Sequence, residues 1–363
     1  MSSASSVVTI ISPMPVTVRS FAKINLGLCI GAPRPDGFHD LRTVYQTIAL
    51  HDVIRVRVGR GAGMEIRCDD PRVPKDQTNT CYRIVERGMA ALQASGRVTI
   101  TIEKRLPVQG GLGAGSGNAV AALLALERAL KKKLPGAERL RIASEVGSDL
   151  PLFLIGGTVL GVGRGEEVYP LPDLPPVCCV VATPEIGVST PKAFADWDAM
   201  MGDPEDDAAE LRSATTGPRP VSTQSGEGAK LTALPPSDRM VGFGRMVSAW
   251  LSGQPLSGVP VSKGRGRAET SLLDLVRTGI ENDFEQVVFP KYPELREVKS
   301  LLEAAGAFYA SLSGSGSAIY GLFRSRSAGQ KAAARMQRDG IPAVATTTLT
   351  RRQYRKKFLV SGF

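Results

Sequence analysis

Residues 107–118 form the segment whose composition points most directly to chemistry. The run Pro-Val-Gln-Gly-Gly-Leu-Gly-Ala-Gly-Ser-Gly-Asn follows a strand-like segment and precedes a helix-like segment rich in alanine and leucine. Glycines allow backbone N–H groups to approach an anion closely, and the N-terminus of a following helix adds a partial positive charge. Five glycines between Gly110 and Gly117 are more than an ordinary strand-to-helix turn needs. We therefore predict a phosphate-binding loop here.

The spacing of these glycines excludes two familiar phosphate loops. The chain has no G-x-x-x-x-G-K-[ST] sequence, so a Walker-type loop is absent. A dinucleotide fingerprint would need a third glycine where the chain has Asn118. A hydride-transfer enzyme is therefore disfavoured.

A lysine and an asparagine lie at alternate positions of the apolar segment 21–28. In a strand Lys23 and Asn25 project from the same face, and a cation is costly to bury without a partner. These residues alone fit a functional polar face and an exposed strand face with a solvated lysine equally well.

A single carboxylate, Asp149, lies in Gly-Ser-Asp-Leu-Pro between a helix-like segment and the apolar run 152–155. Alone it could merely cap or turn the chain. Phosphoryl transfer to an alcohol, however, needs a phosphate-binding loop, a divalent cation, and a carboxylate or cation to handle the hydroxyl proton. The loop, Lys23 and Asp149 supply these chemical types. A later Ser-Gly-Ser-Gly-Ser run at 313–317 joins two apolar strands, and a simple hairpin is its first interpretation.

Length and composition predict a globular protein with two domains. The chain has 363 residues, of which 42% are hydrophobic and 22% charged. The net charge of +10 suits anionic partners such as nucleotides and phosphorylated metabolites. No nucleic-acid-binding motif accompanies the charge, which disfavours nucleic acid as a partner. Part of this charge lies in the basic segment 351–357, for which a solvated chain end is the simplest interpretation.

The cellular setting predicted from the sequence is a reduced cytoplasm. Five cysteines form no C-x-x-C pair, and two histidines are too few to complete a zinc cluster. The longest apolar run is far shorter than the roughly 20 residues that span a bilayer. Residues 1–15 are expected to be a disordered extension without the features of a secretory signal.

Periodicity predicts mixed α and β structure throughout. Strands are expected at 16–30, 52–58, 97–103, 157–169, 177–183 and 308–323, and helices at 79–94, 116–132, 137–146 and 293–305, with a last helix and strand after them. Residues 202–270 are rich in Gly, Pro, Ser, Thr and charge, and we expect a flexible insertion in which only 240–251 has a helical rhythm.

Taken together and in this order, the segments resemble the three motifs of the galactokinase, homoserine kinase, mevalonate kinase and phosphomevalonate kinase (GHMP) superfamily. Within it, the stretches 22–26, 34–39, 147–151, 163–166 and 282–285 resemble the 4-diphosphocytidyl-2-C-methyl-D-erythritol kinase family. The resemblance implies an α+β fold of two domains: an ATP-binding domain like ribosomal protein S5 at 16–172, and a ferredoxin-like α/β sandwich at 173–363. It also implies a place in the methylerythritol phosphate route to isoprenoid precursors.

The resemblance assigns roles to individual residues. Asp149 would be the catalytic base and Lys23 its cationic neighbour, while Ser116 is a possible ligand of Mg²⁺. Asn25, Phe38, His39, Thr190 and Phe194 would bind the substrate, with the aromatic rings stacking on cytosine. ATP would be held by residues of the loop and one preceding lysine, namely Lys104, Pro107, Gly110, Gly111, Leu112, Gly113, Ala114, Gly115, Ser116 and Gly117.

Two departures from the family pattern affect this interpretation. The family loop commonly reads Gly-Gly-Gly-Ser-Ser, whereas this chain has Gly-Ala-Gly-Ser-Gly at 113–117, so one hydroxyl is missing; Phe38 also replaces the more usual tyrosine. Two alternatives stay open: a mevalonate or homoserine kinase of the same superfamily, and a basic nucleotide- or nucleic-acid-binding protein without catalysis. The expected partner is a cytidine-diphosphate polyol, with the protein a monomer or homodimer away from membranes.

Overall fold

The computed structural model of the chain describes residues 14–108, 110–202, 236–252 and 280–360. Most of the predicted N-terminal extension, and most of the predicted insertion at 202–270, therefore lie outside the described residues. Within the insertion, helix α7 (Pro236–Ser252) is described, and it covers the segment with the predicted helical rhythm. No helix of the described part is long and apolar enough to cross a membrane.

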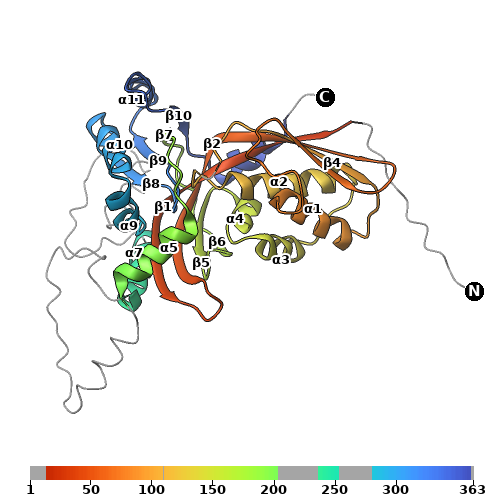
Figure 1. The fold of residues 1–363 in the computed structure, drawn as a ribbon, viewed down its shortest axis with the longest axis horizontal. Helices are drawn as coiled ribbons and strands as arrows, with labels where there is room; N and C mark the ends of the chain where they lie inside the picture. Colours follow the sequence, from red (N-terminus) through yellow and green to blue (C-terminus); the bar gives the residue numbers. More distant parts are fainter. Residues whose placement is uncertain (1–13, 109, 203–235, 253–279, 361–363) are drawn as a thin grey trace, which may run out of the picture.

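The first half of the chain builds a six-stranded sheet around two long strands, which lie side by side through the middle of Figure 1. Strands β1 and β2 pair antiparallel. Strand β4 pairs with the C-terminal part of β2 and β3 pairs with β4, whereas β5 pairs with the N-terminal part of β2 and β6 pairs with β5. Their bounds are β1 Val16–Pro33, β2 His39–Gly59, β3 Met64–Cys68, β4 Arg97–Glu103, β5 Thr158–Val162 and β6 Glu167–Pro170.

Four helices cover one face of this sheet and form its core, on the right in Figure 1. They are α1 Thr80–Ala91, α2 Ala114–Ala129, α3 Gly136–Val146 and α4 Leu150–Ile155. Helix α2 is buried on nearly every side because alanines and leucines occupy most of its positions. A helix that is apolar all round belongs in the interior, and this one carries the glycine loop at its N-terminus.

The second half builds a four-stranded antiparallel sheet in the order β10-β7-β9-β8. One face packs against β1 through an apolar cluster that includes Ile24, Val181 and Tyr320, and the other face is covered by helices. The strands are β7 Cys178–Ala182, β8 Tyr309–Leu312, β9 Ile319–Phe323 and β10 Ala343–Thr347. The helices are α5 Thr190–Met201, α9 Glu285–Lys291, α10 Pro293–Ala304 and α11 Arg326–Arg338.

The basic segment near the C-terminus differs from the solvated end expected from sequence. It forms helix α12 (Arg351–Phe358), which begins with a capping box on Thr350 and packs back against the first half of the chain. Arg351 donates to the carbonyl oxygens of Thr158 and Leu171, and the Tyr354 hydroxyl donates to Phe153 O at 2.6 Å. The hydrogen bonds of Arg351 and Tyr354 therefore hold this charged helix against the first half of the chain.

Candidate active site

The glycine loop ends where α2 begins, and its backbone requires glycine at two positions. Gly111 and Gly113 have φ angles of +78° and +66°, in the left-handed region that other residues rarely adopt. A Cβ atom on Gly111 would lie 2.0 Å from the carbonyl oxygen of Ser313, and one on Gly113 would lie 3.0 Å from Cγ of Lys23. The glycines thus let the loop approach both the late Gly-Ser turn and the N-terminal strand.

The late turn is a β8–β9 hairpin, as its simplest interpretation predicted, but it also holds the loop. The N–H of Ala318 donates to Gly110 O at 3.1 Å, and the Ser313 hydroxyl donates to Gly111 O at 3.0 Å. Asn282 supports the turn from behind, since its side-chain amide donates to Leu312 O and Gly314 O. Three segments far apart in sequence are therefore fixed together.

A cavity of about 360 Å³ opens beside the loop. Nearly all of the predicted nucleotide-binding residues line this cavity. The exception is Gly117, which lies close to β1: a Cβ atom at this position would be 2.9 Å from Phe21 O and from Ser20 Oγ. Lys104 lines this cavity but is paired with the fully buried Asp52 at 2.7 Å. Asp52 also accepts from Asn118 and from two backbone N–H groups, which ties the start of the loop to β2.

Lys23 and Asp149 come together, as the sequence analysis required. Their Nζ and Oδ2 atoms lie 3.5 Å apart, and the lysine side chain is 4% exposed against 35% for the aspartate. The ammonium also donates to Asn25 Oδ1 at 2.7 Å, and Asn25 donates to Thr43 at 2.8 Å. Lysine and asparagine thus form one polar face inside the molecule, and the exposed-face alternative is wrong.

The electrostatics of this pair are set first by burial. Burial lowers the pKa of Lys23, and the neighbouring Asp149 carboxylate partly offsets that effect. A Cβ on Gly314 of the late turn would lie 3.3 Å from the Lys23 ammonium, so the turn covers the pair. The arrangement offers a half-exposed carboxylate and a shielded cation beside a glycine-lined cavity.

Apart from Asn25 on β1, the predicted substrate-binding residues lie on the hairpin after β1 and on α5. His39 stacks on Phe194 with ring centroids 5.0 Å apart, and its Nε2–H donates to Asp198 Oδ1 at 2.6 Å. Phe38 is 49% exposed, and the guanidinium of Arg164 lies 5.0 Å from the centroid of its ring. Core packing was the alternative explanation for both phenylalanines. It is wrong for the exposed Phe38, whereas Phe194 also makes an edge contact with Phe284.

The Thr190 hydroxyl forms a hydrogen bond of 2.7 Å with the Ser315 hydroxyl, which links α5 to the late turn.

Sequence reasoning missed a tyrosine that touches the predicted base. The Tyr45 hydroxyl donates to Asp149 Oδ1 at 3.0 Å. Little in the sequence pointed to Tyr45, because residues 39–51 do not show the pattern of a strand. In the structure β2 starts at His39 and places Tyr45 opposite Asn25. Asn282 was part of the recognised pattern but had no assigned role.

The oxygen atoms around the loop determine whether a metal ion fits there. The described residues contain no cluster of three or more His, Cys, Asp or Glu side chains able to hold a metal. Ser116 lies half-buried at the loop-lined cavity, and the buried Oδ1 atom of Asn118, in the same cavity, has no hydrogen-bond partner. These oxygens fit Mg²⁺, which keeps several waters and takes few protein ligands when phosphates are bound.

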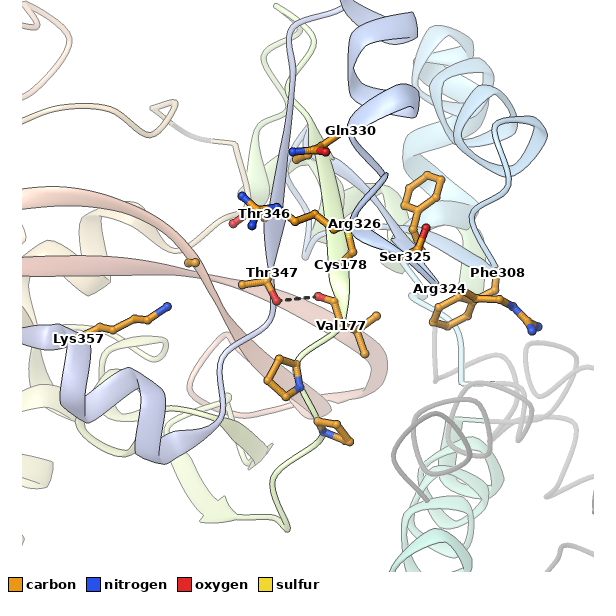
Figure 2. A pocket seen from close by; sticks show the side chains of 15 residues that line it. Val177, Cys178, Phe308, Arg324, Ser325, Arg326, Gln330, Thr346, Thr347 and Lys357 are labelled. Atoms are coloured by element: carbon orange, nitrogen blue, oxygen red, sulfur yellow. Dashed lines mark hydrogen bonds between the residues drawn. The ribbon is translucent and has the colours of Figure 1, made fainter. Parts of the chain in front are cut away.

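A larger hollow, of about 660 Å³, lies between α11, β10 and α12 and is shown in Figure 2. Its walls carry the basic residues Arg324, Arg326 and Lys357, hydroxyl groups such as Thr347, and apolar side chains. Neither its lining nor that of the loop cavity contains an Asp, Glu or His. The loop cavity, however, is lined by Gly113, whose Cβ position lies 3.0 Å from Cγ of Lys23, and Lys23 is paired with the carboxylate of Asp149. The smaller cavity at the loop is therefore the better candidate for chemistry.

Two family models match the chain. The model for the GHMP kinases N terminal domain matches residues 79–157, which contain the glycine loop and Asp149. The model for the GHMP kinases C terminal matches residues 268–341, which contain the late turn.

Curated relatives are similar over most of the chain. The 4-diphosphocytidyl-2-C-methyl-D-erythritol kinase of Solibacter usitatus is 35% identical over 86% of this chain and 82% of its own length. The protein of the same name from Acaryochloris marina is 32% identical over 88% of this chain and 91% of its own length.

Solved structures share the fold. A crystal structure of 4-(cytidine 5'-diphospho)-2C-methyl-D-erythritol kinase has a TM-score of 0.63 and 29% identity, covering 92% of this chain and 98% of that one. A homoserine kinase from Cytophaga hutchinsonii has a TM-score of 0.63 with 20% identity, covering 94% and 97%. A mevalonate kinase has a TM-score of 0.61 with 10% identity, covering 92% and 99%. The last two likenesses bear on the fold alone.

Proposed function

The chain belongs to the 4-diphosphocytidyl-2-C-methyl-D-erythritol kinase family of GHMP kinases, and from this we propose that it transfers a phosphoryl group from ATP to the 2-hydroxyl of 4-diphosphocytidyl-2-C-methyl-D-erythritol. The observation that carries the proposal is the meeting of Lys23 and Asp149 beside the loop. A binding protein has no use for a buried cation and a half-exposed carboxylate at that point. The reaction is a step of the methylerythritol phosphate route to isoprenoid precursors and takes place in the cytoplasm.

Phosphoryl transfer at this site uses few protein groups. Asp149 Oδ2 accepts the proton of the acceptor hydroxyl, the alkoxide oxygen forms a bond to the γ-phosphorus, and the bond to the β-phosphate oxygen breaks to release ADP. The Lys23 ammonium stabilises the negative charge that develops on the attacking oxygen. Its hydrogen bond to Asn25 keeps it aimed at the site.

The donor side is the loop and its cavity. Backbone N–H groups of the loop and the N-terminus of α2 would bind the triphosphate of ATP, and Lys104 would line the same cavity. Mg²⁺, held by Ser116 and phosphate oxygens, would neutralise charge on the phosphates when bound. The loss of the second family serine leaves Ser116 as the only loop hydroxyl for this role.

The acceptor side lies between the hairpin after β1 and α5. Phe38, His39 and Phe194 would hold cytosine by stacking and edge contacts. The stacked rings of His39 and Phe194, and the exposed ring of Phe38 next to His39 in the chain, support this assignment. Asn25 and Thr190 would bind the polyol between them and the late turn. The site would thus be formed between two domains, at 16–172 and 173–363.

Measurement of ADP release tests the substrate assignment. Purified protein with ATP and Mg²⁺ should release ADP with 4-diphosphocytidyl-2-C-methyl-D-erythritol and not with mevalonate or homoserine. ADP release with mevalonate alone would contradict the proposed acceptor while leaving the kinase class intact. Absence of release with all three, together with salt-sensitive RNA or DNA binding, would favour a non-catalytic protein.

A further inference from the structure

The two carboxylate oxygens of Asp149 have different neighbours. Oδ1 accepts a hydrogen bond from the Tyr45 hydroxyl at 3.0 Å, and Oδ2 lies 3.5 Å from the Lys23 ammonium. The Asp149 side chain is 35% exposed and makes no capping bond to α4, the short helix that it precedes. Within the described structure, Tyr45 is thus the residue whose hydrogen bond fixes the rotation of this carboxylate.

Tyr45 is itself held rigidly. It is 2% exposed and lies in the middle of β2, opposite Asn25 on β1 and Val159 on β5. Two glycines make room for its ring: a Cβ on Gly161 would lie 2.5 Å from Tyr45 Cε2, and one on Gly165 would lie 2.6 Å from its hydroxyl oxygen. The hydroxyl therefore has one available position, and that position points at Asp149.

The direction of this hydrogen bond is fixed by chemistry. Burial, followed by the nearby Asp149 charge, raises the pKa of Tyr45 well above its ordinary value. The phenol therefore keeps its proton at any pH at which the protein works, and it can only donate to the carboxylate. Oδ1 therefore accepts one hydrogen bond from the phenol, and Oδ2 is the oxygen without a phenol donor.

We propose that Tyr45 is a positioning residue for proton transfer: by holding Oδ1 of Asp149, it directs Oδ2 toward Lys23 and makes Oδ2 the oxygen that receives the acceptor hydroxyl proton. This inference rests on the proposed kinase function. Under this proposal the two neighbours of the Asp149 carboxylate have different roles: Tyr45 sets the orientation of the carboxylate, and Lys23 supplies positive charge.

The first test is Tyr45→Phe, which keeps the ring and removes only the hydroxyl. We expect kcat to fall about tenfold, as for a lost hydrogen bond to a charged group, with KM for ATP and for the acceptor changed less than about twofold. Tyr354→Phe is the matched control, because its buried hydroxyl also makes one hydrogen bond, to Phe153 O at 2.6 Å. The control should keep wild-type kcat. Tyr45→Phe with unchanged kcat overturns the proposal.

A double-mutant cycle separates positioning from a general structural effect. If Tyr45 acts through Asp149, adding Tyr45→Phe to Asp149→Asn should lower kcat by less than about twofold further. A full tenfold additional loss in that background would show that Tyr45 acts by another route and would overturn the proposal. Thermal unfolding of Tyr45→Phe should match that of Tyr354→Phe.

The same cycle is run on whichever acceptor of the three-substrate panel supports ADP release. Wild-type turnover with mevalonate or homoserine alone would contradict the proposed substrate. The rates of the Tyr45→Phe variant and of the double mutant, measured with that acceptor, would still test the tyrosine proposal. A protein that releases no ADP with any acceptor overturns both. Failure of the tyrosine proposal is therefore distinguishable from failure of the substrate assignment.

Discussion

At the scale of single residues, Asp149 is expected to act in the chemical step and not in the binding of ATP, because it lies beside Lys23 and does not line the loop cavity. We expect Asp149→Asn to lower kcat by about 10²- to 10⁴-fold, the usual contribution of a general base. The dissociation constant for ATP, measured by titration calorimetry, should change less than about threefold. Asp339→Asn, at an exposed position after α11, should leave both unchanged. A variant Asp149→Asn with near wild-type turnover would assign the base elsewhere.

Lys23 makes a prediction about alkaline pH. Since burial lowers its pKa from the ordinary 10.5, the ammonium loses its proton at a lower pH than an exposed lysine does. We expect kcat to decline on the alkaline side with a midpoint below pH 10.5. In Lys23→Arg the guanidinium stays charged, so whatever activity remains should lack this decline. An identical alkaline decline in the two proteins would mean that another group titrates.

At the scale of elements, the glycine loop depends on its contact with the late turn. Gly111→Ala should raise the dissociation constant for ATP by at least about tenfold, because the new Cβ would overlap Ser313 O in a backbone conformation that alanine avoids. Gly136→Ala at the start of α3 is the control, since no atom lies near its Cβ position. Equal ATP affinity in the two variants would contradict the role given to this contact.

The sequence predicted elements well wherever the pattern was local. The strands and helices expected in the first half correspond to β1, β4, α1, α2 and α3 within a few residues. The segment 39–51 of β2 was missed because it mixes charged and polar residues with apolar ones. Burial explains the mixture: Thr43, Gln46 and Thr47 are fully buried and hydrogen-bonded, as in Thr43 to Gly27 O at 2.7 Å. A strand that carries a site does not show the plain alternation that marks ordinary strands.

Contacts across the molecule were beyond sequence reasoning for a physical reason. The motif order suggested that Lys23 and Asp149 meet, but the bond from Tyr45 to Asp149 depends on sheet register. A shift of one residue in β2 would turn Tyr45 to the opposite face. The tie between the loop and the late turn likewise depends on how the two sheets pack. These details follow from tertiary structure, which local propensity does not determine.

At the scale of the whole molecule, a buried ion pair contacts four segments around the acceptor side. Arg239 on α7 pairs with Asp283, which accepts from the N–H of Ile30 at the end of β1 at 2.7 Å. The Arg239 guanidinium also lies 4.8 Å from the ring of Trp197 on α5, the helix that carries Phe194. Arg239 is 1% exposed, so its removal would leave Asp283 as an unpaired buried carboxylate.

We expect Arg239→Met to lower the free energy of unfolding by about 3 kcal/mol, measured by urea denaturation. Lys356→Met on the exposed side of α12 should change it by less than about 0.5 kcal/mol.

The same carboxylate predicts how stability depends on pH. Burial, partly offset by Arg239, raises the pKa of Asp283 from the ordinary 3.8 to about 6. Between these two values the folded protein binds more protons at this group than the unfolded chain does, so its contribution to stability is complete below pH 3.8 and is lost as pH rises through about 6. The shift bounds the effect at about 3 kcal/mol.

The comparison that isolates this contribution is between wild type and Asp283→Asn, which keeps an acceptor for the Ile30 N–H and cannot titrate. Free energies of unfolding are measured by urea denaturation at intervals from pH 4 to pH 7, and the wild-type value minus the variant value is plotted against pH. This difference should fall as pH rises through about 6, because only the wild-type group loses its proton. A difference that rises over the same range would mean that the ion pair with Arg239 outweighs burial and holds the Asp283 pKa low.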